Sequence, residues 1–475
     1  MVARVLSGQR DGLRRRVGRG VVGLAGWGLA ALTAGASAPW RDSIQVDPGF
    51  AYYRDRSPQS VAVELKVNGF RSVRYLVTSE QHLNTAFVAA CRQLGLRVCY
   101  GTFGNGTYAP RDLPTGWEAW RMRLRDPEAR VPSYTYLCMN HPEYRRWKKT
   151  QIVQTLRRVP FDGLEIVESF WPAFRGPESP LYGCLCEHCI AAFRRAFPDV
   201  PGAPNFTDPT RADYFLTNRM LYARWTDFRA RSVGAFLDEI INGPEGVRRH
   251  FPKLPVAVWG LALDVPAPVE TLRAWEGIDG AWLVQSVRPD LYVLQTDWPD
   301  WMKSDLPADY PLRYRPFVEA IRATGSRVPI QLQADVGSAE NCRRGLDWLR
   351  ACARAARRAG MDGVTAYEYH LLRDIYEAPP RPVTVTGRSN VITLAFNKRL
   401  DAVRAADPAH YRVAPGSIGS VKVDGNLVEL TVNGRPGAVT VSGLADDPTR
   451  RLFKNHPAVT MPEPVTLAVR WMGKP

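Results

Sequence analysis

From about residue 49 to residue 369, short runs of β-branched and aromatic residues alternate with longer stretches of helical periodicity. This alternation is typical of a parallel sheet whose strands are connected by helices. We interpret as strands the runs 49–53, 72–77, 97–103, 163–170, 256–261, 280–284 with 291–296 close behind, 328–334 and 363–369. Eight β/α units within roughly 330 residues predict a (β/α)₈ TIM barrel, and a doubly wound sheet is the main alternative.

The longest helices are expected over 211–250 and 343–359, and another begins near Asn140 with Pro142 in its first turn. Proline is tolerated there because the first-turn N–H has no helical partner. Asp162, Asp279 and Asp362 each precede a glycine at the start of an expected strand. That is the end of the barrel opposite to the functional one, so we interpret them as turn or capping residues.

The pattern changes at Pro379-Pro380-Arg381-Pro382, after which short alternating strands replace helical periodicity. Asp424-Gly425 lies between two of these strands as a hairpin turn. About ninety residues of this kind predict a small β-sandwich. The stretches 392–400 and 407–411 resemble the immunoglobulin-like modules of bacterial surface proteins and polysaccharide-acting enzymes. We therefore expect a barrel domain over 39–380 and an immunoglobulin-like domain over 381–475.

The N-terminus has the features of a signal peptide, which we assign to residues 1–38. Arg14, Arg15, Arg16 and Arg19 form a basic region before an apolar stretch, 21–34, that ends in small residues. We expect a protein exported to the periplasm or secreted, by the Sec route or, because of Arg15-Arg16, by the twin-arginine route. An uncleaved signal anchor is the alternative. Gly18, Gly20 and Gly23 match G-x-G-x-x-G, but no strand precedes them, so no dinucleotide site or organic cofactor is expected.

The chain has a formal net charge of +16. Its lysines and arginines are scattered rather than arranged in a stripe, so we expect no nucleic-acid partner. Beyond the N-terminal segment no apolar run reaches about 18 residues, so no membrane span is expected after signal cleavage.

Acidic and aromatic residues recur at the carboxyl ends of the expected strands, where barrels of this kind carry their functional groups. These residues are Glu168, Trp171, Trp259, Asp297, Trp298, Asp300, Trp301, Gln333, Asp335, Glu368, Tyr369 and His370. Carboxylates interleaved with aromatic rings suit a site that stacks sugar faces and acts on an acetal. Glycoside hydrolysis requires two carboxylates facing one another across the scissile bond.

We assign Glu168 as the acid that protonates the leaving oxygen. Asp335 is the first choice for nucleophile or base, and Glu368 is the second. Glu165 should point to the face opposite to Glu168, and an ion pair inside the barrel is its alternative role. The expected sugar platforms are Trp171, Trp298, Trp301 and Tyr369, with Trp259, Asp297, Asp300, Gln333 and His370 completing the binding site.

Three of the eight cysteines form a C-x-C-x-x-C motif at Cys184, Cys186 and Cys189, and Cys138 lies upstream. Four thiolates can bind zinc tetrahedrally, leaving no position open for water, so such a site would be structural. Disulfides are the alternative, because an exported protein meets oxidants.

The element C-x-N-x-P-x-Y-R from Cys138 to Arg145, then a strand ending near Glu168, then C-x-C-x-x-C followed by Ala-Phe-Arg, resembles the zinc-cluster region of the family 42 β-galactosidases. The resemblance implies a structural zinc ion held by Cys138, Cys184, Cys186 and Cys189, with Glu168 as the acid/base. The chain departs from that family in two places. Val167 stands where the family has asparagine, and Asp335 stands where it has a glutamate nucleophile.

The sequence thus predicts an exported glycoside hydrolase that cleaves an oligo- or polysaccharide with paired carboxylates. Two other classes stay open. A polysaccharide lyase would use Tyr369 or His370 as its base. A non-catalytic glycan-binding barrel would explain the missing asparagine before Glu168.

Overall fold

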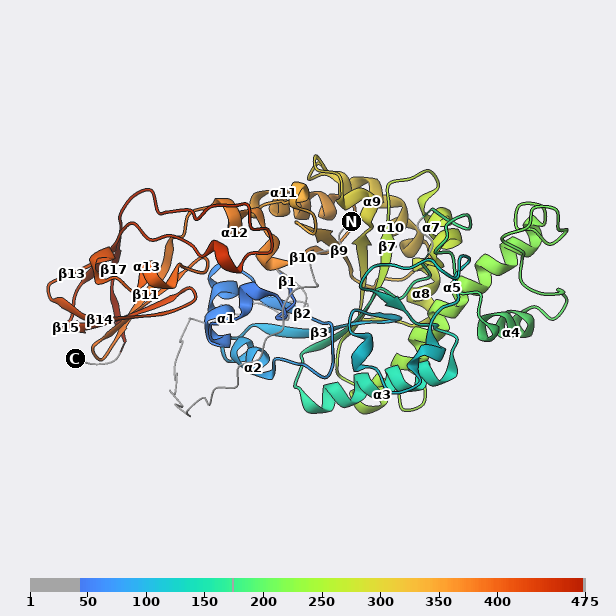
Figure 1. Cartoon of the computed structure of the whole chain (residues 1–475), viewed down its shortest axis with the longest axis horizontal. Coiled ribbons are helices and arrows are strands. Elements are labelled where there is room, and N and C mark those ends of the chain that lie inside the picture. Colours follow the sequence, from blue (N-terminus) through green and yellow to red (C-terminus); the bar gives the residue numbers. More distant parts are fainter. Residues whose placement is uncertain (1–42, 173–174, 473–475) are drawn as a thin grey trace.

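The computed structural model describes residues 43–172 and 175–472 (Figure 1). The expected signal peptide, residues 1–38, lies outside the described residues. Eight parallel strands form one sheet in the order β1-β2-β3-β6-β7-β8-β9-β10. They are β1 (Ser43–Val46), β2 (Ser72–Val77), β3 (Arg97–Phe103), β6 (Gly163–Val167), β7 (Val256–Ala262), β8 (Leu291–Thr296), β9 (Ile330–Asp335) and β10 (Gly363–Tyr367).

The first and last strands of this sheet meet. The Thr365 hydroxyl of β10 donates to the Ser43 carbonyl oxygen of β1 at 3.3 Å. Inside the sheet, the Gln333 amide of β9 donates to the Gln45 amide oxygen of β1 at 3.2 Å. The sheet is therefore a nearly closed (β/α)₈ barrel, as the alternation of strands and helices predicted.

Helices surround the barrel (Figure 1). They are α1 (Pro58–Val67), α2 (Thr85–Gln93), α3 (Pro142–Arg158), α4 (Glu187–Ala196), α5 (Arg219–Ile241), α6 (Val247–His250), α7 (Pro268–Glu276), α8 (Gly280–Ser286), α9 (Trp298–Trp301), α10 (Arg315–Ala323), α11 (Leu346–Arg358) and α12 (Arg373–Glu377). Among the described residues, no helix combines the length and the apolar character that crossing a membrane requires.

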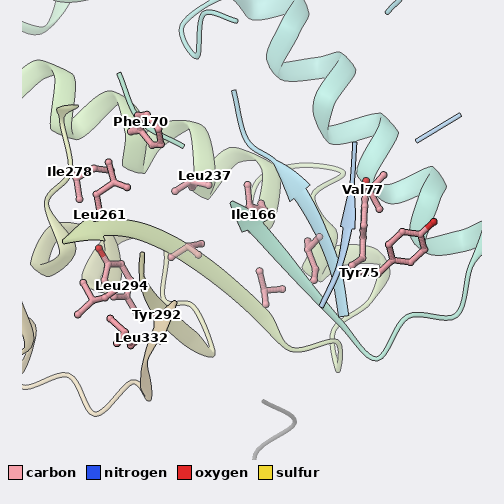
Figure 2. Close-up of a cluster of buried hydrophobic side chains, with 14 of the residues drawn as sticks. Tyr75, Val77, Ile166, Phe170, Leu237, Leu261, Ile278, Tyr292, Leu294 and Leu332 are labelled. Atoms are coloured by element: carbon pink, nitrogen blue, oxygen red, sulfur yellow. The ribbon is translucent and has the colours of Figure 1, made fainter. Parts of the chain in front are cut away.

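Each barrel strand points alternate side chains outward to the helices and inward to the barrel axis. Figure 2 shows part of the outer layer, in which Tyr75, Ile166 and Leu332 of the sheet lie in one cluster with Leu237 of α5. The inner face carries a separate apolar cluster that includes Phe103 and Trp259. The barrel is thus a filled core.

Glu165 lies in this interior. Its carboxylate is 3.0 Å from the Arg74 guanidinium and accepts from Trp259 Nε1 at 3.1 Å. All three side chains are buried. The ion pair and the indole N–H both engage Oε2 of Glu165, which offsets part of the cost of burying the carboxylate, while its Oε1 makes no hydrogen bond to any of the described residues. Glu165 therefore holds the barrel interior together, the role given above as its alternative.

Two predicted strands are wrong. Residues 49–53 contain a short 3₁₀ turn, Ala51–Tyr53, and the first strand is β1, a few residues earlier. Residues 280–284 form part of α8, which Asp279 caps by accepting from the Trp282 N–H. The predicted helix over 211–250 begins later, and the chain forms α5 and α6 in that region.

The amino ends of the strands are tied together by aspartates. Asp162 accepts from the Val98 N–H at 2.9 Å, and Asp362 accepts from the Ile330 N–H at 2.8 Å. Each carboxylate satisfies the first N–H of a neighbouring strand region, which is a capping function. The interpretation of these two residues as turn or capping groups is thereby confirmed.

The C-terminal region is all-β apart from short turns and the helix α13 (Ala402–Ala405). One sheet has the order β14-β15-β12-β11-β18 and a second has the order β13-β16-β17. The strands are β11 (Pro382–Arg388), β12 (Val391–Phe396), β13 (Tyr411–Ala414), β14 (Ser417–Asp424), β15 (Leu427–Asn433), β16 (Ala438–Val441), β17 (Val465–Ala468) and β18 (Arg470–Met472). A separate apolar core, which includes Ile392, Leu430 and Val439, draws on strands of both sheets. The immunoglobulin-like assignment of this region stays a prediction.

Candidate active site

Glu168 directly follows β6 at the carboxyl end of the barrel. Its backbone has φ 53°, in the left-handed region that non-glycine residues rarely adopt. Strained backbone conformations of this kind cluster at functional sites, where the strain holds a side chain in a particular orientation. The Glu168 side chain accepts one hydrogen bond, from Gln295 Nε2 of β8 at 3.1 Å. Burial raises the pKa of its carboxyl group, although the residue keeps some contact with solvent.

Asp297 follows β8 and begins α9, where its carboxylate accepts from the Trp298 N–H at 2.7 Å. Burial is the main reason that its pKa rises to about 7, and the charges of Asp300 and Glu168 raise it further. The contribution of the Glu168 charge to the raised pKa of Asp297 indicates that the two carboxyl groups lie near one another. A third member of this group is Glu276, a buried carboxyl at the end of α7 whose pKa is raised by burial and by Asp297.

Asp47 directly follows β1 and contributes another half-buried carboxyl at the same end of the barrel. It accepts from the Gly49 N–H at 2.8 Å. Burial raises the pKa of Asp47 to about 7, and the negative charge of Glu368 contributes to the rise. The barrel mouth therefore contains several carboxyl groups that ionise at unusually high pH.

Tyrosines from the segment between β3 and α3 border these carboxyls. β4 (Gly106–Thr107) pairs with β5 (Thr135–Tyr136), and this small sheet places Tyr108, Tyr134 and Tyr136 together. The ring centroids are 4.7 Å apart for Tyr108 and Tyr134 and 4.9 Å apart for Tyr134 and Tyr136. Burial raises the pKa of each phenol, and the charge of Glu168 adds to the effect in all three. Tyr108 is 43% exposed, so this tyrosine wall is partly open to solvent.

Asp335 and Glu368 lie at the barrel mouth, but their oxygens are occupied by protein donors. Asp335 accepts from the N–H groups of Gly337 and Ser338 at 2.9 and 2.8 Å and from the Ser338 hydroxyl. Glu368 accepts from the Asp47 N–H at 2.7 Å, from the Tyr53 hydroxyl at 2.6 Å, and from both the N–H and Nδ1 of His370. Neither is as free as Glu168 to act on a substrate.

Several predicted sugar contacts are instead buried in the protein. Trp171 is 1% exposed and donates its ring N–H to the Arg229 carbonyl at 3.0 Å. Tyr369 is buried and its hydroxyl donates to Glu64 at 2.9 Å. Trp259, Gln333, Asp300 and His370 are buried as well. A ring with no exposed face cannot stack on a sugar, so the structure gives Trp171 and Tyr369 no role as sugar platforms. The assignment of Trp259, Gln333, Asp300 and His370 to the binding site stays a prediction. Trp298 and Trp301, in α9 beside Asp297, are half-buried.

The sequence interpretation missed Asp47, Gln295, Glu276 and the tyrosine wall. Asp47 was missed because the first strand was placed after it rather than before it. Tyr108, Tyr134 and Tyr136 belong to a long tyrosine-rich segment whose folding back over the barrel mouth has no periodic signal. The available sequence signal was the recurrence of tyrosine in the segment after the strand 97–103.

The four predicted zinc ligands come together. Their sulfur atoms all lie within 4.8 Å of one another. Cys138 Sγ is 3.5 Å from both Cys186 Sγ and Cys189 Sγ, which is far beyond the roughly 2.05 Å of a disulfide bond. All four thiols are free. With Zn–S bonds of about 2.3 Å, four thiolates at these separations can surround one tetrahedral ion. The donor set therefore fits a metal ion, and disulfides are absent from this cluster.

The cluster joins the loops that follow β3 and β6. Cys138 comes after β5, and the other three cysteines lead into α4. Beside it, the Asn105 amide donates to the Phe170 carbonyl at 2.8 Å and its oxygen accepts from the Phe170 N–H at 3.2 Å. These contacts fix the segment carrying the tyrosine wall against the segment that follows Glu168.

Compared with known protein families, the sequence matches none, and no curated protein is detectably similar in sequence. The structure is similar to the PgaB (BpsB) glycoside hydrolase domain from Bordetella bronchiseptica, with TM-score 0.52 and 15% identity over 70% of this chain and 95% of that one. It also matches the catalytic domain of beta-amylase from Paenibacillus polymyxa, with TM-score 0.48 and 11% identity over 70% of this chain and 92% of that one. A beta-galactosidase from Rahnella sp. R3 matches with TM-score 0.46 and 14% identity over 68% of this chain and 50% of that one. At such identities the likeness shows the fold, a TIM barrel.

Proposed function

We propose that this protein is a glycoside hydrolase whose reacting pair is Glu168 and Asp297. The observation that carries the proposal is that these two carboxyls directly follow β6 and β8 at the same end of the barrel, where burial raises the pKa of both and the charge of Glu168 adds to the rise at Asp297. A fold shared with a glycoside hydrolase domain agrees with this reading by analogy. Asp297 thereby replaces Asp335 and Glu368 as the proposed partner of Glu168.

The chemistry requires one protonated and one ionised carboxyl group. Two nearby carboxyls with raised pKa values can share a single proton around neutral pH, because the first negative charge opposes formation of the second. Glu168 would protonate the leaving oxygen. The Gln295 amide donates to one oxygen of Glu168, which leaves the other oxygen to carry the proton. Asp297 would act at the anomeric carbon, directly or through water. The partly exposed Tyr108 would stack on a sugar ring.

We further propose that the cysteine cluster holds a structural zinc ion and that the protein is exported. Zinc at Cys138, Cys184, Cys186 and Cys189 would stabilise the two loops beside the active site rather than take part in the reaction, because all four ligands come from the protein. Export rests on the arginine-rich apolar N-terminus. N-terminal sequencing of protein recovered outside the cytoplasm would find a start near residue 37 or 39 if the signal is cleaved.

The decisive experiment measures reducing ends released from a panel of oligo- and polysaccharides. We expect release by the wild-type protein and a loss of about a hundredfold or more in Glu168→Gln and in Asp297→Asn. Glu270→Gln, a change of the same kind at an exposed site on α7, is the matched control and should keep full activity. Substrates with good leaving groups should be affected less by Glu168→Gln, because they need less protonation.

Two results would refute the proposal. Products that carry the ultraviolet absorbance of unsaturated uronates would identify a lyase. Binding of glycans without release of reducing ends would identify a non-catalytic barrel.

A further inference from the structure

A groove of about 530 Å³ lies between α3 and α4, outside the barrel mouth. Its lining includes Arg145, Arg146 and Lys149 of α3, His188 and Arg195 of α4, and Glu239 of α5. Residues three, four and seven positions apart share one face of a helix, so α3 and α4 each turn a basic face toward the groove. The volume falls within the range of about 300–1,000 Å³ that is usual for small-ligand sites.

Basic side chains outnumber acidic ones in the lining of the groove. Glu239 contributes the one carboxylate of the lining, and it already pairs with Arg145 at 3.1 Å and with Lys149 at 3.6 Å. In the described part of the chain, Arg146 and Arg195 make no ion pair or side-chain hydrogen bond, and both are exposed. Two guanidinium groups on opposite walls are therefore available to an anion.

The walls of the groove are held in place by the cysteine cluster. Asn140 donates from Nδ2 to Cys189 Sγ at 3.4 Å, and its Oδ1 accepts from Arg145 at 3.2 Å. Cys186 caps the helix that carries His188 and Arg195. A preorganised pair of walls loses less entropy on binding a ligand than flexible side chains on an open surface would.

We propose that this groove binds the acidic groups of a glycan, either sulfate or uronate carboxylate. Guanidinium groups recognise such planar or multidentate anions through paired hydrogen bonds. A nucleic acid is disfavoured, because the lining contains no phenylalanine, tyrosine or tryptophan on which a base could stack. The choice of a sugar as carrier of the anion rests on the proposed function, whereas the binding itself does not depend on the active-site carboxyls.

The test is calorimetric titration of the full chain with a sulfated disaccharide, a uronate trisaccharide, a neutral trisaccharide and a short single-stranded DNA. We expect both acidic sugars to bind, and binding to weaken as salt is raised, because the contacts are electrostatic. The variant Arg146→Glu/Arg195→Glu should weaken binding by at least about tenfold, since it places two like charges opposite the ligand. The matched control is Arg194→Glu/Arg354→Glu, which reverses two exposed arginines outside the groove and should bind like the wild type.

Equal binding by the groove variant and the control, with unchanged melting temperatures, would overturn the proposal. So would DNA binding in the groove more tightly than either acidic sugar, or equal binding of the neutral sugar. Binding by Glu168→Gln separates this inference from the proposed function. If that variant loses turnover but binds acidic sugars normally, both hold. If wild type shows no turnover but binds through the groove, only the hydrolase assignment fails.

Discussion

Glu168, Asp297 and Asp47 are carboxyl groups whose ionisation the folded protein disfavours. For Asp297 the pKa rises from 3.8 to about 7, chiefly because burial removes water from the charged form. The folded state therefore binds the proton more tightly than the unfolded state between these two values. Stability attributable to this group is present at low pH and falls as the pH rises from about 4 to about 7. In the proposed active site, these groups would give up stability for function.

Asp297→Asn should accordingly stabilise the protein while it abolishes turnover. Asparagine keeps the oxygen that accepts from the Trp298 N–H, so the cap of α9 survives. One unit of pKa shift corresponds to about 1.4 kcal/mol, so we expect a gain of at least about 1 kcal/mol in unfolding free energy at pH 8. The gain should vanish near pH 4, where the wild-type carboxyl is also protonated. Urea denaturation at both pH values measures it. A loss of stability at pH 8 would contradict the electrostatic account.

The same pKa values predict the pH dependence of catalysis. A pair of ordinary carboxyls would lose its shared proton at about pH 4–5, leaving no acid at neutral pH. Burial raises the pKa of Glu168, the proposed acid, so kcat/KM should stay high above the pH at which an ordinary carboxyl loses its proton. Asp297 must be ionised to act at the anomeric carbon, and since its pKa is about 7, kcat/KM should fall as the pH drops below about 7. A pH–rate profile from pH 4 to 9 gives the answer. Activity that instead keeps rising up to pH 9 would exclude a carboxyl as the general acid.

At the residue scale, the sequence predicted the site residues that have a local sequence signal and missed those whose position depends on the fold. Glu168 follows a readable strand, and the cysteines carry a spacing motif. Asp297 was recognised only as a binding residue, because its raised pKa depends chiefly on burial at the folded barrel mouth, which the local sequence does not show. Trp171 was misassigned because nothing in its neighbours shows that its indole N–H would find the Arg229 carbonyl inside the protein.

At the scale of elements, short apolar runs were the main source of error. Ala281 to Val284 is apolar and four residues long, so its periodicity cannot separate a strand from a helix. The Asp279 cap was the feature that favoured α8. β1 was missed for the opposite reason, since Ser43 and Gln45 point polar side chains into the barrel and dilute the apolar signal. The longer strands β2, β3 and β8 have the exact bounds that the sequence predicted.

The cysteine cluster links two elements, and its removal should loosen both. We expect about one zinc ion per purified chain and its loss in Cys186→Ser, with a decrease in unfolding free energy of several kcal/mol, because metal-binding energy becomes folding energy. Elemental analysis and thermal unfolding measure the two effects. Cys342→Ser, a buried thiol that donates to the Met302 carbonyl and lies outside the cluster, should retain the metal. Wild-type protein free of metal, or unchanged metal content in Cys186→Ser, would refute the zinc assignment.

At the scale of the whole molecule, the barrel and the C-terminal sheets are joined by buried polar contacts. Arg399, after β12, donates to the carbonyl oxygens of Tyr52 and Arg54 at 3.1 and 2.6 Å. Lys398 donates to the Ile375 carbonyl of α12 at 3.0 Å and to Asp446 at 2.6 Å. The 3₁₀ turn that these contacts hold carries Tyr53, which donates to Glu368 at the barrel mouth. The C-terminal sheets thus contact the carboxyl end of the barrel through this turn.

Asp446 offers a test of this contact. It pairs with both Lys398 and Arg451, and all three side chains are buried. Asp446→Ala would leave two buried cations without a carboxylate partner, a change that costs about 3–5 kcal/mol. Lys422→Ala, which removes an exposed ion pair with Glu429 on the same sheets, is the matched control and should cost less than about 1 kcal/mol. Because the network contacts the barrel, barrel tryptophan fluorescence and calorimetry should report one transition that moves to lower temperature in Asp446→Ala. Two transitions, with the barrel tryptophans unaffected, would show that the sheets unfold independently and do not stabilise the barrel.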